Sequence, residues 1–428
     1  MEKERKQLKR TRIGKIWLLA FLGVSSVSAE TLTLQTAIEK TLGHHPDIKA
    51  FMLRIEQAER GYDAAFADYL PQVSVSANYT PTRTYVFPTN GQFHTVDDDG
   101  WDAGASVRQK VWDFAKTNAL IDASKVDEDI SRLSLAEAKA LLAFKVKSLY
   151  ELLVVQREAI TVREKDLEAK KAFYAQSKAL VKQGLKTEAD ASRFLSAVYL
   201  AEDSLAVAKA SYEKAKVSLS LYMGVELPDD LQLQDDILKQ EPDGHGDIEN
   251  EVLAENTRLR IDRRTEEKNR RLHRASKNAH YGSIDLQASY TRIATLNDYD
   301  SHYVGISYNL PLYSGGRLSA QEQRSRIGYE IARQQSALEE LAIKDELRSL
   351  LIDIDRYGKT IEAKKAQYDA AQKTRSVLEA RYKEGLATYI ELLDSTSVAL
   401  NAKLGLLEAY YLRSIAIERI DYLKGQIQ

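Results

Sequence analysis

The sequence predicts a mainly α-helical chain, in which two copies of one unit combine long antiparallel coiled-coil helices with β-hairpins. Three observations predict this fold: an internal repeat, helical segments far longer than a globular core needs, and four segments with strand periodicity. The chain has only 7 Pro and 20 Gly among 428 residues, which favours long uninterrupted helices.

The composition excludes several classes of protein. Lys and Arg number 61 and Asp and Glu number 63, so the formal charge of −2 argues against a dedicated nucleic-acid binder. The sequence contains no Cys, which excludes disulfides, thiol nucleophiles and Cys-ligated metal centres. The mean hydropathy is −0.41, and no apolar run of about 18 residues follows the first thirty, which excludes a helical membrane protein.

The first thirty residues have the layout of a secretory signal peptide. Lys and Arg dominate up to Lys15, an apolar stretch follows at 16–24, and small side chains end at Ala29. The alternative is a membrane anchor, but this apolar stretch is too short to span a bilayer. We therefore expect residues 1–29 to be a signal peptide and the chain to be exported.

The remaining chain is a duplicated unit. The segment 182–187, Lys-Gln-Gly-Leu-Lys-Thr, recurs 201 residues later at 383–388 as Lys-Glu-Gly-Leu-Ala-Thr. This offset gives ten identities between 182–224 and 383–425, where chance gives roughly three. We expect a first repeat at 30–225, a linker or equatorial segment at 226–246, and a second repeat at 247–428.

Each repeat is expected to contain three helical regions. The first regions lie at 32–68 and at about 247–280. Long helices are expected at 118–182 and 318–382, because apolar side chains recur every seven residues, as in a coiled coil. Such a helix would be roughly 100 Å long. Shorter partner helices are expected at 188–223 and 389–424, where rows of Ala allow close packing.

Two β-hairpins are expected, at 72–111 and 283–311. Apolar and polar residues alternate in all four strands, and each strand has about ten residues, the length of a tilted membrane-spanning strand. The connections at 81–100 and 292–301 are expected to be outward-facing loops. Open strand edges are not tolerated in lipid, and four strands are too few to close a barrel, so assembly with other copies is expected.

Aromatic residues at the strand ends would form two belts at the surfaces of a membrane. The alternative is a soluble sheet with aromatic residues at its rim, but the export signal and both belts favour the membrane. The residues near the helices are Tyr69, Trp112, Tyr281 and Tyr313, and those at the far ends are Tyr79, Trp101, Tyr290 and Tyr303.

Over nearly all of the chain after residue 29, the sequence resembles the TolC-like outer membrane efflux proteins (outer membrane factors). The resemblance rests on the duplicated plan, on His44-His45-Pro46, on 311–317 (Pro-Leu-Tyr-Ser-Gly-Gly-Arg) and on 381–394 (Arg-Tyr-Lys-Glu-Gly-Leu-Ala-Thr-Tyr-Ile-Glu-Leu-Leu-Asp). It implies a homotrimer with a twelve-stranded barrel, in the outer membrane of a Gram-negative bacterium and extending into the periplasm. Residues 110–116 lack the Pro and both Gly of 311–317, which leaves open how tightly the first strand-to-helix turn is made.

The resemblance also implies a function. The chain would be a passive exit duct for drugs, small molecules or polypeptides in a tripartite efflux or type I secretion system. Its partners would be a periplasmic adaptor (membrane fusion) protein and an inner-membrane pump, with outer-membrane lipid around the strands. No enzyme activity, cofactor, metal or nucleic acid is expected. A runner-up of another class is an exported soluble coiled-coil adaptor or scaffold, which leaves the membrane-length strands unexplained.

The resemblance places the functional residues at the turns between long and shorter helices. Gln183, Gly184 and Leu185, with Glu384, Gly385 and Leu386 in the second repeat, match adaptor-binding tips; a plain helix–helix turn is the alternative. An acidic gate is expected beside them, since rings of carboxylates hold cations in a pore. The alternative is ordinary exposed carboxylates. The gate residues are Glu391, Asp394 and Asp190, the counterpart of Glu391 in the first repeat.

Overall fold

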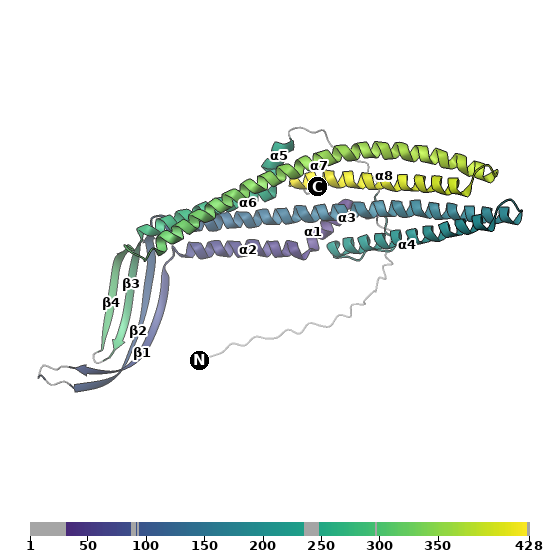
Figure 1. The fold of residues 1–428 in the computed structure, drawn as a ribbon. Helices are drawn as coiled ribbons and strands as arrows, with labels where there is room; N and C mark the ends of the chain where they lie inside the picture. The colour runs from purple at the N-terminus through teal and green to yellow at the C-terminus, as the bar shows by residue number, and fades with distance from the viewer. Residues whose placement is uncertain (1–30, 87–90, 92–93, 235–247, 296–297, 426–428) are drawn as a thin grey trace, which may run out of the picture.

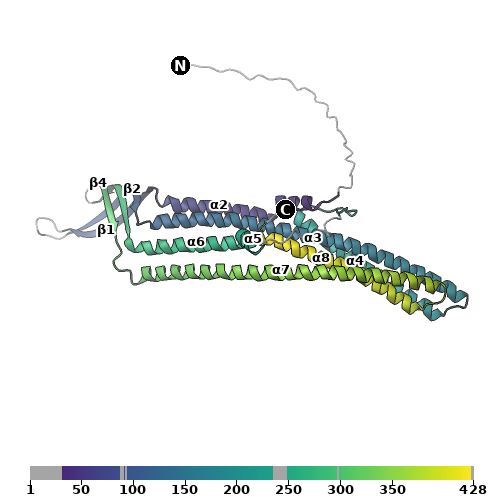
Figure 2. The same ribbon diagram turned by 90° about the horizontal axis from the view of Figure 1, so that it is seen from above.

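The structure is a computed structural model that describes residues 31–86, 91, 94–234, 248–295 and 298–425. The expected signal peptide at 1–29 lies outside these residues, as does the expected linker from residue 235 onward. The molecule is elongated: four strands bend away at one end, and two helical hairpins turn at the other (Figure 1). Near the strands, α2, α3, α6 and α7 lie side by side in that order (Figure 2).

The fold class is confirmed: the chain is mainly helical, with four antiparallel strands and the same element order in both repeats. The elements of the first repeat are α1 (Leu34–His44), α2 (Pro46–Ala67), β1 (Gln72–Val86), β2 (His94–Trp112), α3 (Lys116–Lys182) and α4 (Glu188–Met223). Those of the second are α5 (Ile248–Glu255), α6 (Thr257–Asn278), the 3-10 turn η2 (Ala279–Tyr281), β3 (Ser283–Ala294), β4 (Asp298–Asn309), α7 (Arg317–Lys383) and α8 (Tyr389–Leu423).

The first helical region of each repeat is two helices and not one. Pro46 occupies the first turn of α2, where a missing N–H costs nothing, and it ends α1 at the preceding residues. In the second repeat the break falls at Asn256, whose side chain accepts a hydrogen bond from the N–H of Leu259 at 3.0 Å. The Asn256 amide also donates to the carbonyl of Leu423 at 2.9 Å, so this cap ties α6 to the end of α8.

Tyr150 of α3 contacts two segments from other parts of the chain in the middle of the molecule. Its ring is fully buried, and its hydroxyl donates to the carbonyl of Leu32 at 2.6 Å and accepts from the N–H of Gln234 at 2.9 Å. Leu32 and Leu233 pair as a parallel bridge. The buried phenol therefore helps to hold the segments that precede α1 and follow α4 against the long helix.

The sheet has the order β1-β2-β3-β4, and its register separates a mainly apolar face from a mainly polar face. On the polar face the hydroxyls of Ser74 and Ser106 lie 2.8 Å apart, and the Asn78 amide donates to Asp102 at 3.0 Å. The pairs on the apolar face are Val73–Val107, Val75–Ala105, Ala77–Ala103, Leu286–Ile306 and Ala288–Val304. Valine and isoleucine side chains on this face are exposed in the isolated chain.

The first hairpin is longer than expected. Residues 81–86 and 94–100 continue β1 and β2, so the expected loop at 81–100 is wrong for most of its length. Thr and Tyr in this stretch favour strands, and Arg83 pairs with Asp97 across the hairpin at 3.2 Å. Pro81 is tolerated because β1 is an edge strand of this sheet. The expected loop at 292–301 is likewise shorter, since β3 ends at Ala294 and β4 begins at Asp298.

The strand-to-helix turn of the first repeat is as tight as that of the second. Phe114 and Ala115 adopt left-handed φ values of 56° and 64°, where the second repeat has Gly315 and Gly316 at 61° and 81°. The buried Asp113 supports the turn, because its carboxylate accepts hydrogen bonds from the N–H and hydroxyl of Thr117. The missing glycines are therefore compensated by contacts and do not alter the backbone.

The left-handed backbone conformation of Ala115 gives a prediction. We expect Ala115→Gly to stabilise the chain by about 1 kcal/mol, because the left-handed penalty of roughly 1–2 kcal/mol exceeds the entropic cost of glycine. Denaturant unfolding in detergent would measure this. Gly316→Ala is the matched control: a Cβ there meets no atom within 4 Å, so any loss of stability comes from φ alone. A neutral Gly316→Ala would contradict the strain argument.

Candidate functional site

The two helical tips share one backbone design. In the first tip Gly184 has φ 73°, and the N–H of Leu185 donates to the carbonyl of Leu180 at 3.0 Å. In the second tip Gly385 has φ 76°, and the N–H of Leu386 donates to the carbonyl of Arg381 at 2.8 Å. This is the Schellman motif, which ends a helix with a left-handed glycine.

The helix that leaves each tip begins with a capping box. At α8 the carboxylate of Glu391 accepts from the N–H of Thr388 at 2.7 Å and from its hydroxyl at 2.8 Å. The N–H of Glu391 donates in turn to the Thr388 hydroxyl at 3.3 Å. Thr187 and Asp190 make the same contacts at α4. Two of the three expected gate acids therefore also cap the helices that carry them.

The cap favours the ionised form of Glu391. The backbone N–H of Thr388, followed by its hydroxyl, lowers the pKa of Glu391, although the side chain is exposed. The positive end of the α8 dipole acts in the same direction. This carboxylate therefore stays ionised when the solution is mildly acidic.

The structure brings Glu391 and Asp394 together but leaves Asp190 on the other tip. Glu391 and Asp394 line one groove of about 420 Å³ between α7 and α8, with Thr374 and Val398 among the other lining residues. Asp190 lies near Tyr382 and contributes to the raised pKa of that phenol, which is mainly due to burial.

An aromatic cluster, which the sequence analysis did not identify, joins the two tips. Phe194 of α4 is fully buried, and its ring centroid lies 5.6 Å from that of Tyr382 and 6.2 Å from that of Tyr389. Phe173 of α3 lies 6.1 Å from Phe194. Arg193 covers the Tyr389 ring at 4.7 Å. The first repeat thus supplies phenylalanines and the second supplies tyrosines to one contact.

The internal repeat contains the signal for this cluster. At the 201-residue offset, Phe173 and Phe194 correspond to Thr374 and Ser395, and Tyr382 and Tyr389 correspond to Val181 and Glu188. Aromatic residues therefore occur where the two copies differ. Positions at which duplicated units differ are candidates for contacts between the units.

The outermost tip residues are exposed. Leu185 and Leu386 are 66% and 68% exposed, and Gln183 and Glu384 flank the two glycines with their side chains in solvent. Each tip therefore presents one large apolar side chain beside polar ones.

The expected aromatic belts are partly rearranged. Tyr79 and Trp101 are cross-strand partners on the apolar face, and Tyr290 shares that face through its pairing with Ala105. The register places Tyr303 on the polar face instead, where its ring lies against Gly305, so it does not share a face with the other three far-end aromatic residues. The alternation of β4 makes this unavoidable, because Val304 and Ile306 occupy the apolar face.

Near the helices the aromatic residues lie around Phe114. Its ring centroid is 5.5 Å from Tyr281 and 6.4 Å from both Trp112 and Tyr308, and the Tyr308 hydroxyl donates to the carbonyl of Tyr281 at 3.1 Å. Tyr69 precedes β1, and Tyr313, which follows β4, is 90% exposed. Phe114 and Tyr308 join this group although neither was expected in it.

The described residues bear on the class of site in two respects. Among them, no group of three or more His, Asp or Glu side chains is arranged to hold a metal ion. Within the same residues, no helix combines the length and hydrophobicity that crossing a membrane requires.

Comparison with known proteins identifies the class. The family described as "Outer membrane efflux protein" matches residues 37–225 and 249–426. Outer membrane protein TolC of Escherichia coli (strain K12) is 23% identical over 415 residues, covering 92% of this chain and 82% of TolC.

Solved structures show the same fold. The outer membrane protein VceC of Vibrio cholerae superposes with a TM-score of 0.79 at 18% identity, covering 92% of this chain and 97% of VceC. The open-state MtrE outer membrane channel of Neisseria gonorrhoeae gives 0.77 at 18% identity, covering 92% and 88%.

Together with these matches, the duplicated helical fold with its membrane-length strands defines a channel protein of the outer membrane that extends into the periplasm, and not an enzyme. The chain belongs to the outer membrane efflux protein family. This membership favours the channel over the runner-up, an exported coiled-coil scaffold.

Proposed function

We propose that three copies of the chain form a passive exit duct, with twelve strands in the membrane and a helical tunnel in the periplasm. One observation carries the proposal: β1 and β4 are the two edges of a four-stranded sheet that has one apolar and one polar face. In lipid such edges need partners, and pairing β4 of one copy with β1 of the next satisfies both. The polar face would then line the lumen.

An unpartnered apolar stripe on α7 supports assembly with further copies. Ile327, Ile331, Leu338 and Leu341 are exposed, and the first three line a groove of about 690 Å³. A second copy is the occupant that we propose, because the stripe begins in the first part of α7, the helix that follows the edge strand β4. One interface would then run continuously from strand to helix.

Cross-linking tests the trimer. The chain has no Cys, so Ser74→Cys in β1 can be combined with Ser301→Cys, Ser307→Cys or other polar-face positions of β4. We expect oxidation of one such pair to produce a covalent species of three subunits in outer-membrane extracts. A covalent product of only two subunits, or no cross-linked product for any position along β4, would contradict the trimer.

The duct would work with a periplasmic adaptor protein and an inner-membrane pump. The proposed adaptor contact is the pair of tips, because Leu185 and Leu386 present apolar side chains that the fold leaves exposed. No nucleotide or metal chemistry is needed in this chain, since energy would come from the pump. A pull-down with purified adaptor tests this: Leu185→Ser with Leu386→Ser should weaken capture, while the exposed Leu221→Ser on α4 should not.

The acidic gate gives a prediction at the tip of α8. We expect Glu391→Gln with Asp394→Asn to raise single-channel conductance and to weaken block by divalent cations, because three copies would lose six carboxylates at the entrance. Glutamine still serves a capping box, so this pair of changes removes charge without removing the cap.

Planar-bilayer recording of the purified channel would measure both effects. Thr388→Ala is the control, because it breaks the cap and leaves both carboxylates in place. Cation block should survive in Thr388→Ala. Equal loss of block in the two variants would assign the effect to the cap, and unchanged block in the Gln/Asn variant would refute the gate.

A further inference from the structure

A carboxylate is buried in the middle of the tunnel wall. Glu151 of α3 is 0% exposed, and the hydroxyl of Ser414 on α8 donates to its Oε1 at 2.7 Å. Its Oε2 is buried without a hydrogen-bond partner among the described residues. An ionised carboxylate normally accepts several hydrogen bonds, so this environment favours the neutral form.

The neighbouring charges do not neutralise Glu151. Lys147, one turn earlier on α3, pairs with Glu418 of α8 at 2.6 Å, and both side chains are almost buried. One ammonium group therefore serves two carboxylates. The other titratable groups nearby are Tyr411, whose pKa Glu151 helps to raise, and Asp421, which helps to raise the pKa of Glu418.

Burial is the main reason that the pKa of Glu151 is raised, to about 7, and the charge on Glu418 adds to it. The Ser414 hydrogen bond and the Lys147 charge lower it, but by less. The raised value agrees with the geometry, in which one oxygen has no donor.

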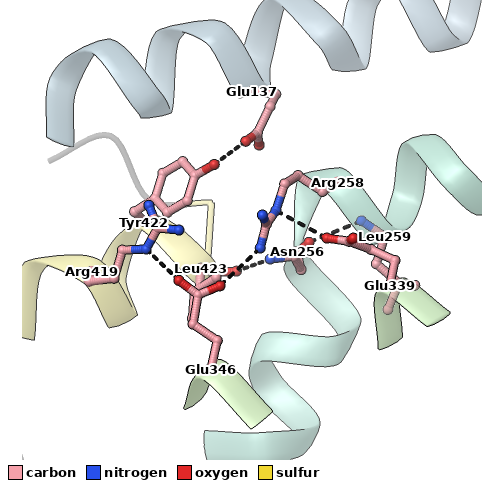
Figure 3. A network of polar contacts seen from close by, with 9 residues as sticks. All are labelled: Glu137, Asn256, Arg258, Leu259, Glu339, Glu346, Arg419, Tyr422 and Leu423. Carbon is pink, nitrogen blue, oxygen red and sulfur yellow. Dashed lines mark hydrogen bonds and ion pairs between the residues drawn. The ribbon is translucent and has the colours of Figure 1, made fainter. Parts of the chain in front are cut away.

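A second polar cluster on the same helix provides a contrast. Around the end of α8, Arg419 pairs with Glu346 at 2.6 Å, Arg258 pairs with Glu339 and Glu346 at 3.2 Å, and Tyr422 donates to Glu137 (Figure 3). Each carboxylate there meets an arginine or a hydroxyl from another helix. Glu151 has only a single neutral donor on α8, so the two clusters differ in how well they hold a charge.

We propose that Glu151 is a proton-binding site that makes the packing of α8 against α3 depend on pH. A side chain with no exposed surface is out of reach of a neighbouring copy, so assembly does not supply the missing partner. The contact joins the first repeat to the second, because α3 and α8 belong to different repeats. This contact between α3 and α8 is a joint between the two repeats.

The direction of the pH dependence follows from the linkage between proton binding and packing. The packed joint binds a proton at Glu151 with a pKa of about 7, whereas a separated, hydrated joint has the ordinary value of 4.5. Between these values the packed state holds more protons, so its stability is greatest at acidic pH and falls as the pH rises through 7. From pH 5.5 to pH 8.5 the separated state should gain roughly thirtyfold in relative population.

Hydrogen exchange of α8 measures this change in the full chain. We expect amides near Ser414 to lose protection from pH 5.5 to pH 8.5, beyond the change in intrinsic exchange rate and with a midpoint near 7. In Glu151→Gln the excess should disappear. Glu168→Gln, an exposed carboxylate of the same helix, should behave like the wild type. Identical profiles for the wild type and Glu151→Gln would overturn the proposal.

Two further variants keep the test decisive if Glu151→Gln folds poorly. Ser414→Ala removes a hydrogen bond that favours the ionised form, so the midpoint should move to higher pH. Glu418→Gln removes a like charge and frees Lys147, so the midpoint should move to lower pH. Shifts in one common direction, or no shift in either, would assign the pH response to another group.

Discussion

Phe194→Ala is expected to loosen the contact between the two tips and to destabilise the chain by about 3–5 kcal/mol, the usual cost of emptying a buried phenylalanine site. The ring has no exposed surface and touches aromatic residues of α3, α7 and the start of α8. Because both repeats contribute to this contact, its loss should free the α7–α8 tip from the α3–α4 tip.

Denaturant unfolding and hydrogen exchange at residues 382–392 would measure the two consequences. Phe194→Leu is the matched variant: it keeps an apolar side chain of similar size but loses the edge-to-face contacts, and it should cost only about 1 kcal/mol. Faster hydrogen exchange confined to the tip in Phe194→Ala would show that the contact stabilises the tips only locally. A loss below 1 kcal/mol would contradict the close packing in the structure.

Local signals determined the helices and the strand faces. At each tip a left-handed glycine ends the long helix, α3 or α7, and a threonine cap begins the shorter helix, α4 or α8; the sequence displays both signals at 182–188 and 383–389. The alternation of Val73, Val75 and Ala77 fixes which side chains share a face, because a strand has a strict period of two. Such features depend on neighbours in the sequence.

Other features depend on contacts between residues that are far apart in the sequence. The length of the first hairpin rests on cross-strand pairs such as Arg83–Asp97, whose partners are not neighbours in the sequence. The capping role of Glu391 was readable from Thr388 three residues earlier, but the gate interpretation took precedence. Tyr303 lies near a strand end like the other belt candidates, but its alternation with Val304 places it on the polar face.

The buried charged residues are likewise not evident from the sequence alone. Lys147, Glu151 and Glu418 are ordinary members of charged helices in the sequence, where 29% of the residues are charged. Only the packing of α8 on α3 shows that these three lie out of solvent. A heptad pattern identifies the apolar seam of a coiled coil but not the charges that a second helix pair covers.

Lys147→Met is the second change with a large expected effect. It keeps the apolar length of the side chain but removes the ammonium group that pairs with Glu418, and it leaves the buried Glu151 and the nearly buried Glu418 without that charge. Breaking a buried ion pair by removing one partner costs about 3–5 kcal/mol. We expect this loss at pH 8, where both acids must ionise or take up protons at a cost.

The loss should shrink at pH 5. Burial already raises the pKa of both acids, and removing the Lys147 charge raises it further, so in the folded chain both acids take up protons more readily at that pH than at pH 8. Folded-state pKa values above those of the unfolded chain mean that stability falls as the pH rises. Denaturant unfolding at both pH values would measure this, and Lys147→Met with Glu418→Gln should recover most of the loss at pH 8. A destabilisation that is equal at the two pH values would mean that lost packing, and not uncompensated charge, is the cause.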